Sequence, residues 1–194
     1  MKKKLEDYVL TAQSALPIKL CKDTIKEINK NKKNWSTHKW HNRSNEEVAS
    51  LSGNKELDNL YMRSNNSQEI MRLLWHVIRG YTKHLDFPWF QEWNGYTEVR
   101  FNIYKKNKQM SDHCDHIASI FDGQRKGVPI LSCVGALNDN FEGGEFMMFD
   151  DMTFKLKQGD VLVFPSNFLY PHRVNPVKKG ARYSFISWVW LLQK

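Results

Sequence analysis

Two histidines and one aspartate in the second half of the chain have the types and spacing needed to hold a metal ion. The motif His113-Cys114-Asp115 lies in a run, His113–Ile120, whose composition is typical of a β-strand. Side chains two residues apart on a strand share one face, so the imidazole of His113 and the carboxylate of Asp115 can approach the same ion. A further histidine, His172, opens another predicted strand. The sequence therefore predicts a metal site with two imidazole ligands and one carboxylate ligand.

Other members of these motifs are not expected to bind the ion. By strand alternation Cys114 points away from the metal, and we expect it to be buried and unreactive. His116 falls on the opposite strand face and is predicted to be structural or at the surface. A second pattern of the same type, His84-Leu85-Asp86, ends a predicted helix. Residues two apart on a helix point in nearly opposite directions, so we interpret this pattern as a structural helix end.

The ligand set indicates which chemistry the ion would perform. Two histidines and one carboxylate leave three positions open on a six-coordinate ion, the facial arrangement of non-haem Fe(II) centres that also bind a co-substrate and O2. Zinc hydrolases usually keep one open position, so a hydrolase is less favoured. A keto acid that chelates iron needs a cation for its distant carboxylate. Arg182 offers a bidentate guanidinium, and Ser184 on the same strand face adds a hydroxyl donor.

The first half of the chain is predicted to supply helices that support this site. Leu20–Asn31 has the pattern of a short amphipathic helix, and Ser67–Asp86 has the clearest helical pattern, with Asn66 and Glu69 as a capping box. The apolar stripe of the second helix is expected to brace a sheet, and its members recur at spacings of three and four: Ile70, Leu74, Val77, Ile78, Tyr81 and Leu85. Trp35–Ser44 has no period and is predicted to be a loop.

After residue 95 the chain consists of short strand-like runs separated by turn signals. The runs are Thr97–Tyr104, His113–Ile120, Pro129–Leu137, Glu145–Phe149, Thr153–Leu156, Asp160–Phe164, His172–Asn175 and Arg182–Trp190. This spacing favours an antiparallel jelly roll over alternating strands and helices. Trp188 and Trp190 alternate with Val189, so one of these tryptophans is expected in the core or in the pocket. We predict a mainly β fold with flanking helices, residues 1–95 supporting a core of residues 96–194 in one compact domain.

The motifs and their order resemble the Fe(II)/2-oxoglutarate dioxygenases, and within them the prolyl 4-hydroxylase-like branch. The resemblance extends over roughly residues 95–190. It rests on Tyr104, His113-Cys114-Asp115, Leu137-Asn138-Asp139, Glu142-Gly143-Gly144-Glu145, Gln158-Gly159-Asp160, His172-Arg173-Val174 and Gly180-Ala181-Arg182.

This resemblance implies a double-stranded β-helix (jelly-roll, cupin-like) core with helices on its outside. Fe(II) would be held by His113, Asp115 and His172, and the co-substrate 2-oxoglutarate by Arg182, with Tyr104 beside it. O2 would be the second co-substrate, and the resemblance leaves open whether ascorbate is also needed. Some relatives place a tyrosine for the co-substrate carboxylate three residues before the Asn of the Leu-Asn motif, where this chain has Gly135.

The activity implied is hydroxylation of an unactivated C–H bond in a peptide or protein, with a peptidyl proline preferred and with release of succinate and CO2. Three alternatives stay open. Oxidative demethylation of alkylated nucleic acid would use the same iron site, although Trp188 stands where the repair-type relatives carry a second arginine. Hydroxylation of another side chain or a small molecule is a second alternative, with loops such as Trp35–Ser44 and Gly123–Gly127 closing the site. A non-catalytic binding module is the third.

Composition narrows the setting of this chemistry. The 194 residues are 41% hydrophobic and 13% aromatic, enough for one packed core. The net charge of +8 is concentrated in residues 1–40, which hold ten lysines and four acidic residues, so a nucleic-acid partner is not favoured. Three widely spaced cysteines suit a reducing compartment. No membrane-spanning run and no convincing secretion signal are found, so a cytoplasmic location without membrane contact is expected, and the oligomeric state is left open.

Overall fold

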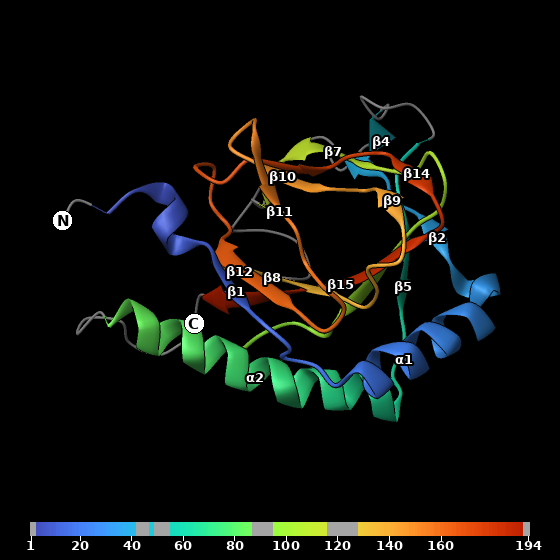
Figure 1. Ribbon diagram of the computed structural model, residues 1–194, viewed down its shortest axis with the longest axis horizontal. Coiled ribbons are helices and arrows are strands. Elements are labelled where there is room, and N and C mark those ends of the chain that lie inside the picture. The colour runs from blue at the N-terminus through green and yellow to red at the C-terminus, as the bar shows by residue number, and fades with distance from the viewer. Residues whose placement is uncertain (1–2, 42–46, 49–54, 87–94, 116–127, 192–194) are drawn as a thin grey trace.

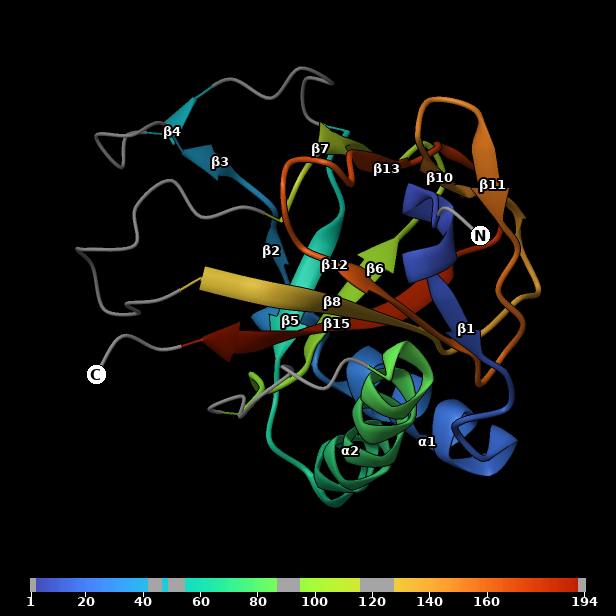
Figure 2. The same ribbon diagram turned by 90° about the vertical axis from the view of Figure 1, so that its left-hand side faces the viewer.

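The structure, a computed structural model, describes residues 3–41, 47–48, 55–86, 95–115 and 128–191. Two layers of strands face each other across the middle of the molecule, and two helices lie beneath one layer (Figure 1). The helices are α1 (Ile18–Lys30) and α2 (Asn65–Leu85), and the shorter 3-10 helices are η1 (Leu5–Tyr8) and η2 (Lys32–Asn34). The turned view shows α1 and α2 side by side under the larger sheet (Figure 2). Among the described residues, neither helix combines the length and apolar character needed to cross a bilayer.

The larger sheet has seven strands in the order β1-β12-β8-β15-β6-β5-β2. Every pairing in it is antiparallel. Its strands are β1 (Leu10–Ala12), β2 (Ser36–Thr37), β5 (Asp58–Tyr61), β6 (Arg100–Tyr104), β8 (Val128–Ala136), β12 (Val161–Pro165) and β15 (Arg182–Leu191). The N-terminal part of the chain therefore contributes three strands of this sheet as well as both helices.

The smaller sheet has four strands in the order β11-β10-β13-β7, again antiparallel. They are β7 (Met110–His113), β10 (Phe146–Met148), β11 (Met152–Phe154) and β13 (His172–Val174). Two further antiparallel pairs join β9 (Glu142–Gly143) to β14 (Val177–Lys179) and β3 (Trp40–His41) to β4 (Glu47–Val48). The two facing sheets confirm the predicted mainly β fold with flanking helices.

Helix α2 begins at a serine cap that the sequence analysis placed elsewhere. The hydroxyl of Ser64 accepts the backbone N–H of Ser67 at 3.2 Å, and the hydroxyl of Ser67 accepts the backbone N–H of Ser64 at 2.8 Å. The predicted capping box of Asn66 and Glu69 is wrong, because the helix has already begun before Asn66. At the other end Asp86 takes a left-handed conformation with φ of 49° and stops the helix. The apolar stripe of α2 braces the larger sheet, as predicted.

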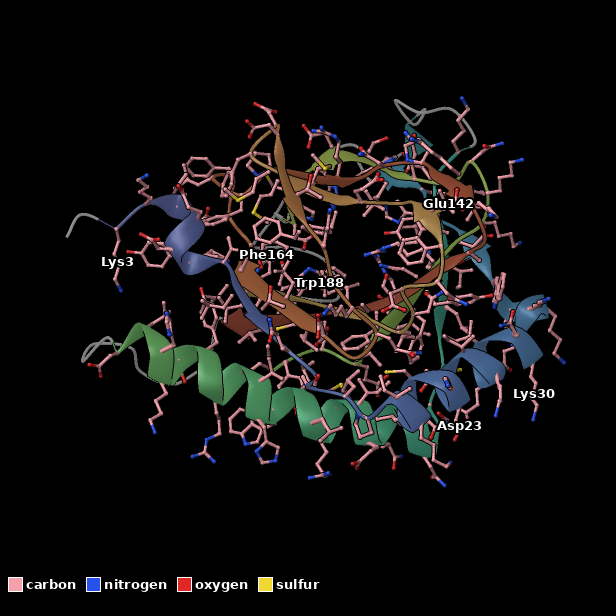
Figure 3. The ribbon with its side chains drawn as sticks, in the orientation of Figure 1. Lys3, Asp23, Lys30, Glu142, Phe164 and Trp188 are labelled. Carbon is pink, nitrogen blue, oxygen red and sulfur yellow. The ribbon has the colours of Figure 1, made fainter. Side chains whose placement is uncertain are left out.

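Two apolar cores lie on the two faces of the larger sheet, and β15 contributes to both. Phe185 and Val189 pack with α2 in the outer core, while Ile186 and Trp188 face the smaller sheet in the inner core. This division follows from strand alternation. Phe164 of β12 also belongs to the inner core, and Figure 3 shows it with Trp188 inside the ring of strands. Even-numbered positions of β15 therefore point into the space between the sheets.

Most of the strands predicted after residue 95 are confirmed, with boundaries that shift by a few residues. The run His113–Ile120 is the exception. The strand in this region, β7, ends at His113, Asp115 follows outside it, and residues 116–120 lie outside the described residues. Strands β9 and β14 were missed, because two or three residues are too few to show an alternating pattern. Part of Trp35–Ser44, predicted as a loop, forms β2 and β3.

Candidate metal centre

His113 and His172 lie opposite each other on neighbouring strands of the smaller sheet. The register of β7 and β13 pairs these two residues, and their ring centroids are 4.3 Å apart. The carboxylate of Asp115 reaches both rings, with Oδ1 3.4 Å from Nε2 of His113 and Oδ2 3.8 Å from Nε2 of His172. One ligand atom from each residue lies within 4.8 Å of the other two. The fold thus brings the three predicted ligands together around one point.

Backbone carbonyls hold both imidazoles in the tautomer that leaves Nε2 free. Nδ1 of His113 lies 2.8 Å from the carbonyl oxygen of Ser111, and Nδ1 of His172 lies 3.0 Å from that of Tyr170. A carbonyl oxygen only accepts hydrogen bonds, so each Nδ1 carries a proton, and Nε2 keeps its lone pair whenever the imidazole is neutral. Metal-binding histidines commonly use this arrangement. The donor set therefore fits a divalent ion such as Fe(II).

Burial and mutual charge set the protonation of the three groups. Burial lowers the pKa of His172 to about 4, so this imidazole is neutral at neutral pH. Burial raises the pKa of Asp115, but the two histidines and Ser132 outweigh it and hold that pKa well below its usual range. Burial also opposes protonation of His113, yet the hydrogen bond and charge of Asp115 leave the pKa of His113 raised. A charged carboxylate beside a neutral imidazole is the state in which these groups ligate metals.

A pair of buried serines supports Asp115 from the larger sheet. The hydroxyl of Ser132 on β8 donates to Oδ2 of Asp115 at 2.7 Å. Its oxygen also lies 2.8 Å from the hydroxyl of Ser166, which can donate to Ser132 in turn. Both serines are almost fully buried. The role of this pair was not predicted from the sequence. The only sign of it was weak, a single serine on the inward face of the predicted strand Pro129–Leu137.

Arg182, Ser184 and Tyr104 form a second cluster on the inward face of the larger sheet. The guanidinium of Arg182 donates to the hydroxyl of Ser184 at 2.9 Å and lies over the ring of Tyr104, 4.8 Å from its centroid. Burial lowers the pKa of Arg182, partly offset by its hydrogen bond to Tyr104. Among the described residues no carboxylate pairs with Arg182. A buried and unpaired cation is costly, so this site calls for an anionic ligand.

The Arg182 cluster opens into a cavity of about 290 Å³ that Ala136, Gly144, Phe146 and Leu156 also line. Gly135, the residue compared with a co-substrate tyrosine, does not face this cavity. A Cβ at that position would lie 2.0 Å from Cε1 of Phe185, in the outer core. A side chain at position 135 would therefore point toward the helices, and the glycine removes no donor from the site.

The remaining predicted residues have mixed outcomes. Cys114 is half-exposed, and its Sγ lies 3.6 Å from the carbonyl oxygen of Phe168. The prediction that Cys114 is buried is wrong, because the chain leaves the sheet after His113. His84 and Asp86 form the end of α2 away from the metal site, as predicted. His116 and the loop Gly123–Gly127 lie outside the described residues.

A second cavity, of about 230 Å³, opens beside the metal ligands. It is lined by His38, Trp40, Arg100, Met110, His113, Cys114, Asp115, Pro129, Trp188 and Trp190. Both tryptophans of β15 line it, where the sequence analysis expected one. Arg100 and Trp40 were not predicted to line a cavity. Arg100 shares the inward face of β6 with Asn102 and Tyr104, a pattern of alternate polar residues, whereas nothing local in the sequence links Trp40 to this cavity.

Comparisons with known proteins agree with this geometry. The family model of the 2OG-Fe(II) oxygenase superfamily matches residues 99–190, so this part of the chain is similar to that superfamily. The 2OG-Fe(II) oxygenases use Fe(II), 2-oxoglutarate and O2, and the site of His113, Asp115 and His172 fits that metal. A PKHD-type hydroxylase of Idiomarina loihiensis is 38% identical over 99 residues, which cover 50% of this chain. The aligned segment spans 43% of the length of that relative.

Two solved structures share the fold. The viral collagen prolyl hydroxylase of Paramecium Bursaria Chlorella virus-1, in its 2OG complex, has a TM-score of 0.70 and 16% identity, covering 96% of this chain and 97% of its own. The prolyl hydroxylase of Trichoplax adhaerens, in complex with a peptide fragment of the hypoxia inducible factor, has a TM-score of 0.68 and 15% identity, covering 94% and 83%. The protein thus has the double-stranded β-helix fold of prolyl hydroxylases.

Proposed function

We propose that the protein is a 2-oxoglutarate-dependent hydroxylase of peptidyl proline that uses His113, Asp115 and His172 to hold Fe(II). The observation that carries the proposal is the convergence of these three groups with Arg182, which pairs with no carboxylate of the described residues, on the inner faces of the two sheets. Two relatives of the same fold are prolyl hydroxylases, and one of them was solved with a peptide. A peptide or protein substrate fits these resemblances.

Different side chains would hold the metal ion and the co-substrate. His113 and His172 would hold the ion through Nε2, and Asp115 would hold it through its carboxylate. Arg182, with Ser184 and Tyr104, takes the distal carboxylate of 2-oxoglutarate. When bound, Fe(II) supplies the redox chemistry by which O2 hydroxylates the substrate carbon and converts 2-oxoglutarate to succinate and CO2. The protein contributes orientation and a site with little water, because His172, Arg182 and Ser184 are all buried.

The demethylase alternative receives no support from the site. Trp188 occupies the position of the second arginine of the repair-type relatives, and it packs in the inner core. The cavity beside the metal ligands, about 230 Å³, is smaller than sites that enclose drug-sized ligands. It suits one side chain of a peptide whose remainder lies outside.

The test combines ligand binding with turnover. Fe(II) and 2-oxoglutarate are added without oxygen and the metal-to-ligand absorption band is followed, then air is admitted with a library of proline-containing peptides. We expect the band to form, succinate to be released, and a peptide to gain the mass of one oxygen atom. His113→Ala should lose the band and the succinate, whereas His84→Ala, at the exposed end of α2, should keep both. Folded protein that forms no band contradicts the metal assignment.

We also propose that the protein works in the cytoplasm. Cys21, Cys114 and Cys133 are all free thiols, and burial raises the pKa of Cys21 to about 11 and that of Cys133 to about 12. Protonated, unpaired thiols suit a reducing compartment. Fractionation of cells that express a tagged chain tests this location.

A further inference from the structure

The cavity beside the metal ligands, which we call the Arg100 cavity, combines an arginine with three tryptophans. Arg100, Trp40, Trp188 and Trp190 line it together with His113 and Asp115. Two of these tryptophans come from the last strand of the larger sheet, and Trp40 comes from β3 in the N-terminal half of the chain. Segments far apart in sequence thus build one wall.

Arg100 is half-buried and holds a positive charge in this wall. Its Nε donates to Oδ1 of Asn102 at 3.1 Å, and its guanidinium lies over the indole of Trp188, 5.2 Å from the ring. Asn102 is neutral, and within the described part of the chain no carboxylate pairs with Arg100. These contacts fix the direction of the guanidinium and leave its two terminal nitrogens for a ligand.

Three tryptophans belong to the same wall. The Nε1 atoms of Trp40, Trp188 and Trp190 are buried. Among the described residues none of them has a hydrogen-bond acceptor. A buried donor without an acceptor is costly, so such groups are normally satisfied by a ligand or by water. All three residues line the same cavity, but their indole nitrogens are closed off from it. The guanidinium of Arg100 is therefore the group that selects the ligand, and it favours a negative charge with acceptor oxygens.

The register of the sheet separates this cation from the co-substrate cation. On β6 and β15, Arg182 pairs with Tyr104, and Arg100 pairs with Ile186. The two arginines therefore stand on one sheet face. Arg182 lies beside Tyr104, which is four residues from Arg100 along β6, so the separation along the strands is about 13 Å at 3.3 Å per residue. One cation can take the distal carboxylate of 2-oxoglutarate while the other meets a second anion.

We propose that the Arg100 cavity binds a carboxylate of the substrate next to the carbon that is hydroxylated. Arg100 takes the carboxylate, and the three tryptophans supply the apolar part of the wall beside it. This inference rests on the proposed function, because it names the substrate class of the same site. The carboxylate has two sources, an acidic side chain beside the target residue or a free C-terminal carboxylate.

Calorimetric titration of the folded chain, with and without Fe(II) and 2-oxoglutarate and in the absence of oxygen, tests the proposal without turnover. Two matched pairs of probes separate the sources of the carboxylate. The first pair is acetyl-alanyl-prolyl-aspartyl-alanine amide and its asparaginyl analogue. The second is acetyl-alanyl-proline with a free carboxylate and its amide. We expect the charged member of at least one pair to bind about tenfold more tightly, the discrimination of one charge-assisted contact.

Arg100→Gln should remove this preference, and Arg100→Lys should restore part of it, since lysine keeps the charge and loses the bidentate geometry. The Lys variant keeps the test decisive if the Gln variant does not fold. Arg72→Gln, an exposed residue of α2 that pairs with Glu69, should keep the full preference. Equal binding within both pairs, or a preference that survives in Arg100→Gln, overturns the proposal. The two failures can be told apart. If the proposed function is wrong and this inference is right, the charged probe still binds more tightly than the neutral probe in the titration without metal.

Discussion

Asp115 of the candidate metal centre is held by polar side chains from both sheets. It contacts both imidazoles and accepts the hydroxyl of Ser132, although it lies just beyond the end of a strand. A ligand on irregular backbone needs such support to keep its orientation. Ser132 on β8 supplies it and is hydrogen-bonded to Ser166, which directly follows β12, so the candidate metal centre rests on both sheets.

Ser132→Ala is expected to weaken metal binding about tenfold, because the carboxylate of Asp115 loses the donor that orients it. Affinity for Mn(II), measured by titration without oxygen, checks this result. Ser187→Ala is the matched control. Ser187 is equally buried and donates to the carbonyl oxygen of Thr97 at 2.7 Å on the opposite face of the larger sheet. It should change stability and leave the metal affinity unaltered, and an equal loss in both variants would refute the role of Ser132.

Tyr104→Phe tests the co-substrate cluster. The hydroxyl of Tyr104 interacts with Arg182, and burial raises the pKa of this tyrosine, which keeps the phenol protonated. Loss of one such hydrogen bond should raise the KM for 2-oxoglutarate by about threefold to tenfold with little change in kcat. Tyr96→Phe removes a hydroxyl that donates to the carbonyl oxygen of Met71 at 2.8 Å, near α2, and should leave the KM unchanged. A Tyr104→Phe enzyme with the parent KM would place the hydroxyl outside the co-substrate site.

At the scale of elements, the pair of β8 and β15 lines both cavities with its inner face and covers the helices with its outer face. Their pairing is the longest in the molecule, from Ser184 opposite Ala136 to Leu191 opposite Val128. Its inner face carries polar groups that serve the site, and its outer face carries the apolar groups that pack on α2. A change on the outer face should therefore act on stability and leave the cavities intact.

Gly135→Ala is expected to destabilise the protein by about 1–3 kcal/mol, because the added methyl group overlaps the ring of Phe185. Chemical denaturation measures the change in unfolding free energy. Gly80→Ala is the opposite case, since a Cβ there meets nothing within 4 Å and the position lies inside α2. Alanine should stabilise that helix by up to about 1 kcal/mol. If Gly135→Ala proved as stable as the parent chain, the tight contact with Phe185 would be wrong.

At the scale of the whole molecule, the candidate metal centre links the smaller sheet to the larger one. The two histidines stand on β7 and β13, while Ser132 and Arg182 belong to β8 and β15. An ion that binds the folded state alone stabilises that state by mass action. The stability of the fold and the occupancy of the site should therefore rise together.

Addition of Mn(II) at about one hundred times its dissociation constant should stabilise the fold by about 2.7 kcal/mol. For a chain of this size such a gain raises Tm by about 5–10 °C. Differential scanning calorimetry with and without a chelator measures the shift. Asp115→Ala should unfold at the same temperature in both conditions. A parent chain that shows no shift while binding Mn(II) would mean that the ion also binds the unfolded state.

The sequence by itself determined the class of the fold and predicted the residues of the candidate site. The residue types at positions 113, 115, 172 and 182, the strand-like runs after residue 95 and the stripe of α2 are local patterns, and local patterns survive without knowledge of the chain path. The wrong predictions were also local, such as the strand predicted to include Asp115, because β7 ends at His113. Short elements and strand ends lack enough residues to show a period.

Only the tertiary structure decided how distant segments meet. The pairing of His113 with His172, the serine behind Asp115, and the arrival of Trp40 beside Arg100 depend on strand register and on the path of the N-terminal half. Register is set by long-range packing, and a shift of one residue would turn every side chain to the other face. That is the physical reason why the candidate metal ligands could be predicted from the sequence, while the wall of the neighbouring cavity could not.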